Sequence, residues 1–356
     1  MSICDIAREE IRALVPYDAD PPDLDFVNLN ANEAPTFPYD AQLAGTQNRY
    51  PELRPRSLQS ALADLFGIDI KKLCPVRGSS EGIDLLIRAF CRAYRDNVVV
   101  LPPTFDMYCA YANMQGAEVR TAPLSVERDF AVDWALLDDQ CDENTRMVFL
   151  CSPNNPTGNL IPKSEILEFT RSRAGKSVVV VDEAYVEFSG CPSLASEIDR
   201  HDNLVILRTL SKAYALAGAR CGAVLADEAV IDLISALTSP YAISAPVTRL
   251  VLTALQGSNR DAADRQIADI VTERNRLSTR LEQLDCIDRV WPSFANFVLV
   301  QFKSADVTGD KLAAAKLTVR QFANNECLRN CARITVGTTE ENNRLIDALG
   351  SSKAGL

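Results

Sequence analysis

The chain has 356 residues, of which 47% are hydrophobic and 24% charged, as in an ordinary globular protein with one large domain or two smaller ones. It carries 37 basic and 48 acidic residues, and the resulting net charge of −11 disfavours nucleic acid and anionic membranes as partners. No segment approaches the ~18 consecutive apolar residues of a spanning helix, and acidic residues near the N-terminus argue against a targeting peptide, so we expect a cytoplasmic protein.

Helix and strand patterns alternate through the first 245 residues. Apolar residues spaced three and four apart predict helices at the N-terminus, after residue 80 and after residue 163. Short β-branched runs between them predict strands, and several are apolar throughout, as strands covered on both faces are. The strand runs are residues 97–101, 117–124, 146–152, 177–183, 203–211 and 221–226. This alternation predicts an α/β protein with a mostly parallel sheet flanked by helices.

The last third of the chain has a different pattern. Residues 247–284 read as one long amphipathic helix, and short strands are expected at 296–302 and 332–338. Thr338 and Glu341 have the spacing of a capping box at the start of a terminal helix. These features indicate a second, smaller α+β unit.

The change of pattern divides the chain into two domains. We expect a large domain over residues 35–245 and a smaller domain built from residues 1–34 and 246–356. The first helix would pack on the smaller domain through one apolar side, formed by Ile3, Ala7, Ile11 and Leu14.

The cysteines and the histidine exclude two kinds of site. Eleven scattered cysteines, an odd number without a CxxC pair, suit reduced thiols in a reducing compartment. Cys327 and Cys331 have the spacing of two metal ligands, but the single histidine, His201, leaves too few partners, so we expect no metal site. The same scarcity excludes a Ser-His-Asp hydrolase, and His201 lies in a polar stretch typical of the surface.

Polar side chains follow three of the predicted strands. They are Asn155 after 146–152, Asp182 and Tyr185 at the end of 177–183, and Lys212 after 203–211. Because the carboxyl ends of parallel strands share one edge of a sheet, these groups are expected to converge. A lysine placed there is either part of a structural ion pair or a reactive amine. A carboxylate, hydrogen-bond donors and Arg220 close by favour the amine, in a site for pyridoxal phosphate.

Two further features would complete such a site. The turn Gly78-Ser79-Ser80 opens a predicted helix, and backbone N–H groups at a helix start bind phosphate, although the turn alone is compatible with a plain N-cap. Phe105 follows a strand, where its ring would stack on the pyridine ring; without the other features it would be a core residue.

Seven segments resemble, in order and spacing, the fold-type-I pyridoxal-phosphate aminotransferases. They are LNANEAP (29–35), NRYPE (48–52), RGSSEGIDLLIRAFC (77–91), CSPNNPTG (151–158), VVDEAYVEF (180–188), LRTLSKAYALAGARCG (207–222) and ARITVGT (332–338). The resemblance covers nearly the whole chain and is closest to the branch that acts on histidinol phosphate. It implies a homodimeric transaminase of histidine biosynthesis, which exchanges an amino group between histidinol phosphate and 2-oxoglutarate with glutamate as donor.

The resemblance also implies roles for single residues. Lys212 would carry the cofactor and move the proton during catalysis. Asp182 would pair with the ring nitrogen, Tyr185 and Asn155 would bind the ring oxygen, and Phe105 would stack on the ring. The phosphate would be held by Ser79, Ser80, Ser211 and Arg220, and by Tyr50 across the dimer interface. Substrate would be bound by Tyr17, Asn155, Arg320 and Arg333, with Arg329 an alternative to Arg320 for the substrate phosphate.

The chain departs from the family pattern at three places, and the one that bears on the substrate is residues 18–26 (DADPPDLDF), where relatives often have a glycine-containing loop that closes over the substrate. Close relatives have an acidic residue or asparagine where Ser80 stands, and a tyrosine where Phe105 stands. Two alternatives for the reaction remain open. One is an aromatic amino-acid aminotransferase with the same cofactor residues, and the other is a threonine-phosphate decarboxylase, which breaks a different bond of its substrate.

Overall fold

The computed structural model of the protein describes residues 2–15, 32, 47–304, 311–322 and 325–350. The helices are α1 (Glu9–Arg12), α2 (Arg56–Phe66), α3 (Ser79–Phe90), α4 (Met107–Gln115), α5 (Trp134–Asp139), α6 (Lys163–Ser172), α7 (Glu228–Leu237), α8 (Ala245–Ala254), α9 (Gly257–Glu282) and α11 (Thr339–Gly350). The strands are β1 (Leu73–Val76), β2 (Asn97–Val100), β3 (Glu118–Thr121), β4 (Thr145–Cys151), β5 (Val178–Asp182), β6 (Leu204–Thr209), β7 (Gly222–Leu225), β8 (Ile287–Val290), β9 (Phe297–Phe302), β10 (Arg320–Gln321) and β11 (Cys331–Thr335). None of the helices in these ranges has both the length and the apolar character needed to cross a bilayer.

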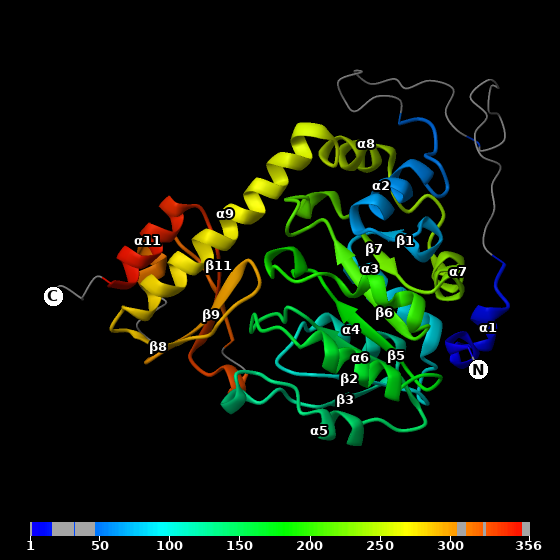
Figure 1. Cartoon of the computed structure of the whole chain (residues 1–356), viewed down its shortest axis with the longest axis horizontal. Coiled ribbons are helices and arrows are strands. Elements are labelled where there is room, and N and C mark those ends of the chain that lie inside the picture. Colours follow the sequence, from blue (N-terminus) through cyan, green and yellow to red (C-terminus); the bar gives the residue numbers. More distant parts are fainter. Residues whose placement is uncertain (1, 16–31, 33–46, 305–310, 323–324, 351–356) are drawn as a thin grey trace.

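The large sheet has the strand order β1-β7-β6-β5-β4-β2-β3 (Figure 1). Strands β3, β2, β4, β5 and β6 run parallel, whereas β7 is antiparallel to both of its neighbours. The predicted α/β architecture is thus confirmed, and each of the six strands expected in this half of the chain is present. Strand β1 was not predicted, because a four-residue run that contains a proline shows no clear period.

The four valines of β5 show why the central strands are apolar throughout. Val178 and Val180 pack in one cluster, with residues of α3, α4 and α7. Val179 and Val181 pack on the opposite face, in a cluster that includes α2 and α6. Each buried valine contributes about 1.5–3 kcal/mol relative to an exposed one. Helices on both faces therefore hold the sheet rigid and fix the position of its edge.

The N-terminal segment packs against the large sheet's helices, and not against the smaller domain as we expected. Ile3, Ala7 and Ile11 are buried in the same cluster as α3 and α7, whereas Leu14 is 44% exposed. Apolar spacing showed which side of this segment is buried, but it carried no information on what covers it. The domain boundaries given above stay a prediction.

The predicted long helix at 247–284 is two helices, so that prediction was wrong at its middle. Helix α8 ends at Ala254, and α9 begins at Gly257, which has a φ of +49°. A break of two residues leaves the apolar pattern on each side nearly unchanged, which is why the pattern did not show it. Helix α9 then extends from the large sheet to the smaller one (Figure 1).

The smaller sheet is antiparallel, in the order β10-β11-β9-β8. Alternate residues of β9 face opposite ways: Val298 and Val300 pack with α9 and α11, while Phe297 and Leu299 join the core of the large domain. The capping box is confirmed, since the Thr338 N–H donates to Glu341 at 2.8 Å and the Glu341 N–H donates to the Thr338 hydroxyl at 3.2 Å. The two domains therefore share a packed boundary along β9.

Candidate active site

The carboxyl ends of β4, β5 and β6 meet at one edge of the large sheet, as the sequence predicted. Cys151 ends β4 and pairs in register with Asp182, which ends β5. Asp182 in turn pairs with Leu207 of β6. The segments that carry Asn155 and Lys212 leave the sheet at this edge, so the three polar groups start from neighbouring strands.

Lys212 lies beyond the end of β6, with its side chain exposed. Its Nζ is 5.7 Å from the centre of the Tyr185 ring. The protein still surrounds the amine enough to lower its pKa, chiefly by desolvation, with the charges of Arg333 and Arg220 acting in the same direction and Asp182 opposing them. An amine that gives up its proton more readily is a better nucleophile toward an aldehyde.

Asp182 is a buried carboxylate with two hydrogen-bond donors. It is 3% exposed. Oδ1 accepts from the Ala184 N–H at 3.1 Å, and Oδ2 accepts from the Tyr108 hydroxyl at 2.8 Å. Burial raises the pKa of Asp182 to about 6, against the opposing effect of these hydrogen bonds and of Lys212. A cation at the carboxylate, such as a protonated ring nitrogen, would stabilise its ionised form.

Tyr108 is a site residue that the sequence reasoning missed. Its ring lies parallel to Phe149, with centroids 4.7 Å apart, and meets Phe105 edge-on at 5.6 Å. Phe105, the predicted stacking residue, is half-buried, and its contact with Tyr108 puts it next to the hydrogen-bond partner of Asp182. The sequence did contain a signal for Tyr108. It lies three residues after Phe105, and a buried tyrosine near a site needs a polar partner for its hydroxyl.

Arg333 brings the smaller domain to the site. It pairs across β11 and β9 with Leu299, and cross-strand partners point to the same face, here the one toward the large domain. Its Nη1 donates to Oδ1 of Asn155, which is buried. That contact uses the Asn155 amide oxygen, so the amide nitrogen remains as a hydrogen-bond donor. The guanidinium also lies 5.4 Å from the centre of the Phe297 ring, so the predicted arginine is held in place.

Tyr185 packs against Phe297, the ring that Arg333 also contacts. It is 6% exposed, and its ring meets Phe297 edge-on at a centroid distance of 5.2 Å. Desolvation raises the pKa of its hydroxyl, so Tyr185 is a neutral donor at physiological pH. Tyr185 and Asn155 therefore present two hydrogen-bond donors at the same end of the sheet as Lys212.

The predicted phosphate turn has the geometry of an anion site. Gly78 precedes α3 with a φ of +79°, and no side chain of the described residues caps this helix start. The Arg220 guanidinium occupies the space beside Gly78, where a Cβ would come within 2.8 Å of Nη2. Arg220 Nη1 also lies 3.4 Å from the Ser211 hydroxyl. Helix N–H groups, an arginine and a serine thus surround one position, while Ser79 and Ser80 stay half-buried.

The remaining predicted site residues are exposed or are not described by the structure. Tyr50 is 55% exposed, and its ring stacks on Tyr241 with centroids 4.6 Å apart. Arg320 is exposed on β10 and is the cross-strand partner of Arg333, whereas Arg329 is exposed at the end of a 3-10 turn. Tyr17 lies outside the described residues.

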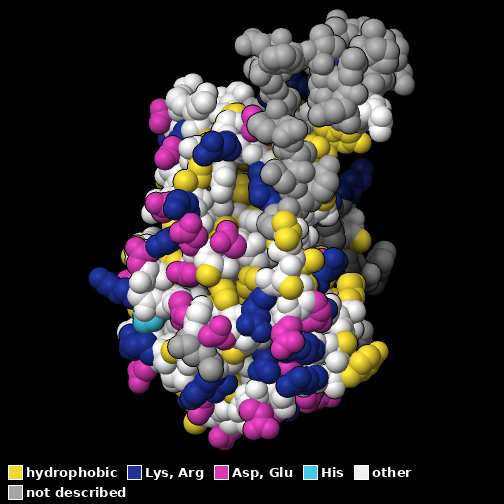
Figure 2. All heavy atoms as spheres, turned by 90° about the vertical axis from the view of Figure 1, so that its right-hand side faces the viewer, with side chains coloured by type: hydrophobic (Ala, Val, Ile, Leu, Met, Phe, Trp, Pro, Cys, Tyr) yellow, Lys and Arg dark blue, Asp and Glu magenta, His cyan; other side chains and the backbone are white. Residues whose placement is uncertain are grey.

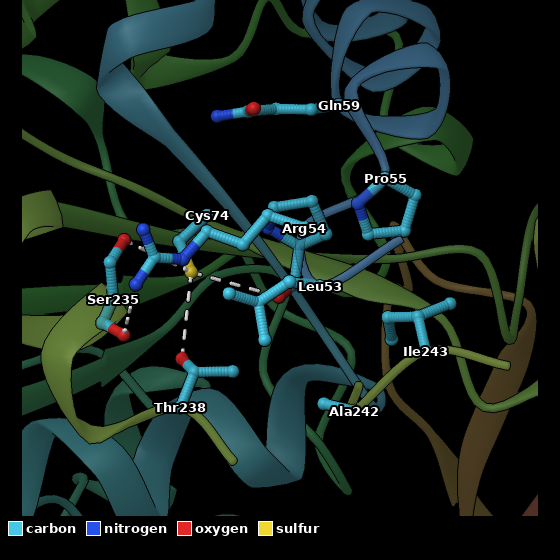
Figure 3. A pocket seen from close by; sticks show the side chains of 10 residues that line it. Leu53, Arg54, Pro55, Gln59, Cys74, Ser235, Thr238, Ala242 and Ile243 are labelled. Atoms are coloured by element: carbon cyan, nitrogen blue, oxygen red, sulfur yellow. Dashed lines mark hydrogen bonds between the residues drawn. The ribbon is translucent and has the colours of Figure 1, made fainter. Parts of the chain in front are cut away.

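A separate depression is lined by none of these residues. Its walls include Arg54, Gln59, Cys74, Ser235 and Thr238 (Figure 3). Arg54 donates to the Ser235 carbonyl at 3.4 Å, and the hydroxyls of Ser235 and Thr238 each lie 3.8 Å from the Cys74 sulfur. These polar groups contact one another, and the depression has no part in the chemistry argued below.

A mostly parallel sheet with a lysine and a buried carboxylate at one edge, and an arginine from a second domain nearby, is the arrangement expected of an aminotransferase-type enzyme. The chain belongs to the aminotransferase class I and II family, whose profile matches residues 24–349. This family depends on pyridoxal phosphate, and the resemblance read from the sequence is confirmed.

Individual relatives narrow the comparison. The histidinol-phosphate aminotransferase of Escherichia coli (strain SMS-3-5 / SECEC) is 40% identical over 360 residues, 98% of each chain. The structure of histidinol-phosphate aminotransferase from Sinorhizobium meliloti in complex with pyridoxal-5'-phosphate matches with a TM-score of 0.76 and 24% identity, over 85% of this chain and 82% of that one. L-threonine-O-3-phosphate decarboxylase from Porphyromonas gingivalis matches with a TM-score of 0.69 and 24% identity, over 85% and 89%. The fold alone therefore does not select the reaction.

Proposed function

We propose that this protein transfers an amino group between histidinol phosphate and 2-oxoglutarate in histidine biosynthesis, with pyridoxal phosphate as cofactor. The observation that carries the proposal is the convergence of Lys212, Asp182 and Arg333 at one edge of the sheet. The choice of substrate is supported by the similarity over nearly the full length to histidinol-phosphate aminotransferase.

The residues present fit pyridoxal phosphate. A side chain at Gly78 would fill the cradle beside Arg220, so the glycine is needed to keep that space for an anion. The buried carboxylate of Asp182 matches a protonated ring nitrogen, and Tyr185 and Asn155 match the ring oxygen. When bound, the cofactor withdraws electrons from the substrate carbon that carries the amino group.

The protein's own groups would perform the remaining tasks. The Lys212 amine, with its lowered pKa, would accept the proton from the α-carbon of the amino donor and, in the second half-reaction, would give a proton to the α-carbon of the newly aminated product. Arg333 binds the substrate carboxylate, for which its contact with Asn155 holds it in place. Arg320 shares a cross-strand position with Arg333, and this register supports Arg320 over Arg329 as the partner of the substrate phosphate.

We propose that the enzyme is a cytoplasmic homodimer in which Tyr50 reaches the cofactor phosphate of the other subunit. The exposed, stacked ring of Tyr50 supports a role at a surface, and the eleven free cysteines support a reducing compartment. Interspersed acidic and basic side chains on the face shown in Figure 2 give no basic patch there for nucleic acid. Mixing inactive Lys212→Ala and Tyr50→Ala subunits should restore activity if each site draws on both chains, and no restoration would contradict the shared site.

The visible spectrum of the cofactor-loaded protein tests the substrate. Histidinol phosphate should convert the yellow lysine-bound cofactor to its amino form at far lower concentration than phenylalanine does. A preference for phenylalanine would replace the substrate with an aromatic amino acid. Release of carbon dioxide from threonine phosphate would replace transamination with decarboxylation, and both outcomes would retain the cofactor assignment.

A further inference from the structure

The Tyr108 hydroxyl lies in a closed environment behind Asp182. Tyr108 is 0% exposed, and its ring is fixed between Phe149, which it stacks on, and Phe105, which it meets edge-on. The hydroxyl donates to Asp182 Oδ2 at 2.8 Å. A buried hydroxyl on a clamped ring has little freedom to leave its partner, so the contact is a fixed part of the site.

We propose that Tyr108 is a positioning residue, whose hydroxyl keeps the Asp182 carboxylate oriented and ionised so that it pairs with the protonated ring nitrogen of pyridoxal phosphate. The inference rests on the function proposed above and names a determinant of that site. It adds a residue that makes no contact with substrate.

The groups around Asp182 show why a single hydroxyl can keep this carboxylate oriented and ionised. Among the described residues, the carboxylate oxygens accept hydrogen bonds from Ala184 and Tyr108, and both donors are neutral. Lys212 is the nearby cation that favours the ionised form. The Ala184 N–H belongs to the backbone, so Tyr108 is the side-chain donor that a substitution can remove.

Tyr108 is a permanent donor at neutral pH. Burial raises the pKa of its hydroxyl well above its ordinary value, and the negative charge of Asp182 adds to the rise. The neighbouring Cys151 thiol is also neutral, because burial raises its pKa to about 12. No titration near neutral pH therefore removes the hydrogen bond from Tyr108 to Asp182.

Loss of the hydroxyl has a defined consequence for the shared proton. A carboxylate that loses a donor becomes more basic, so the proton between Asp182 and the ring nitrogen moves toward Asp182. The ring is then less fully protonated and withdraws electrons less strongly. Arg333 contacts Asn155 and Phe297 rather than Tyr108, so substrate binding through Arg333 should change little.

Tyr108→Phe tests this in the cofactor-loaded enzyme, because it removes the hydroxyl and keeps the stacked ring. Tyr111→Phe is the matched control: it lies on the same helix, is half-buried, and is not a donor to Asp182. The main readout is nitrogen NMR of pyridoxal phosphate labelled at the ring nitrogen. Tyr108→Phe should move the resonance toward the unprotonated position and lower kcat about ten- to hundredfold, with KM for glutamate nearly unchanged. Tyr111→Phe should change neither.

A wild-type resonance in Tyr108→Phe would overturn the inference while leaving the proposed function intact. If wild-type protein itself forms no lysine-bound cofactor, the proposed function fails, and the two failures are thereby distinguished. If Tyr108→Phe does not fold, site-specific 3-fluorotyrosine at position 108 replaces it. This more acidic phenol is a stronger donor, so the resonance should move toward the protonated position, and an unchanged resonance would refute the role.

Discussion

Replacing Gly78 with alanine tests the proposed phosphate cradle. Gly78 has φ +79° and ψ 163°, a conformation nearly confined to glycine, so alanine there costs about 1–3 kcal/mol in backbone strain. The new Cβ would also lie 2.8 Å from Nη2 of Arg220. Since Nη2 is the end of a flexible side chain, the guanidinium moves away and the cradle loses its cation.

That movement should mainly weaken the binding of the cofactor phosphate. A charge-assisted hydrogen bond contributes about 1.5–3 kcal/mol, so losing Arg220 should weaken the binding of pyridoxal phosphate roughly 10- to 100-fold. Pyridoxal, which lacks the phosphate, should bind Gly78→Ala almost as it binds the wild type. The quantity to measure is therefore the ratio of the two Kd values, by equilibrium dialysis of the cofactor-free protein.

Gly67→Ala is the control for backbone strain. Gly67 ends α2 with a φ of +65°, and a Cβ there meets nothing within 4 Å. It should cost about 1 kcal/mol and lower Tm by about 2–4 °C without changing the Kd ratio. An unchanged ratio in Gly78→Ala, with Tm lowered as in Gly67→Ala, would refute the placement of the phosphate beside Arg220.

Three further substitutions have definite outcomes. Lys212→Ala should abolish the covalent cofactor adduct trapped by borohydride, and a single trapped site in this variant would exclude Lys212. In the cofactor-free protein burial raises the pKa of Asp182 from 3.8 to about 6, so the folded state binds the extra proton and stability falls as pH rises between these values. Between these pH values the free energy of unfolding should fall by up to about 3 kcal/mol in the wild type. Asp182→Asn should remove this fall, as measured by denaturant unfolding over a pH series. Arg320→Ala should raise KM for histidinol phosphate more than for glutamate, and an equal effect of Arg329→Ala would contradict the choice between them.

The sequence predicted the part of the site that the parallel sheet determines. Strands apolar throughout must be buried on both faces, and their carboxyl ends must then share an edge, which is enough to bring Asp182 and Lys212 together. The resemblance implied that Arg333 binds the substrate, and an inward arginine in a strand needs a partner. Its position opposite Leu299, on the face toward the large domain, supports that expectation.

What the sequence did not predict depends on contacts between segments far apart in the chain. Tyr108 and Asp182 are 74 residues apart in the chain, and the tertiary packing that also brings Tyr108 against Phe149 and Phe105 places the hydroxyl at the carboxylate. The N-terminal segment has an apolar side whose spacing is equally compatible with either domain. Local periodicity reports which side of an element is buried, and the surface that covers it is set by the tertiary fold.

The net charge of −11 has the wrong sign for a protein whose proposed substrate and cofactor both carry phosphate. We propose that arginines from separate elements offset this charge at the site. The Arg220 guanidinium lies beside Gly78, the residue before α3, while Arg320 and Arg333 lie on adjacent strands of the smaller sheet, in cross-strand register. A charge acts strongly over a few ångströms and is screened beyond about 8–10 Å, so we propose that these local arginines, and not the net charge of the chain, determine which ligands the site attracts.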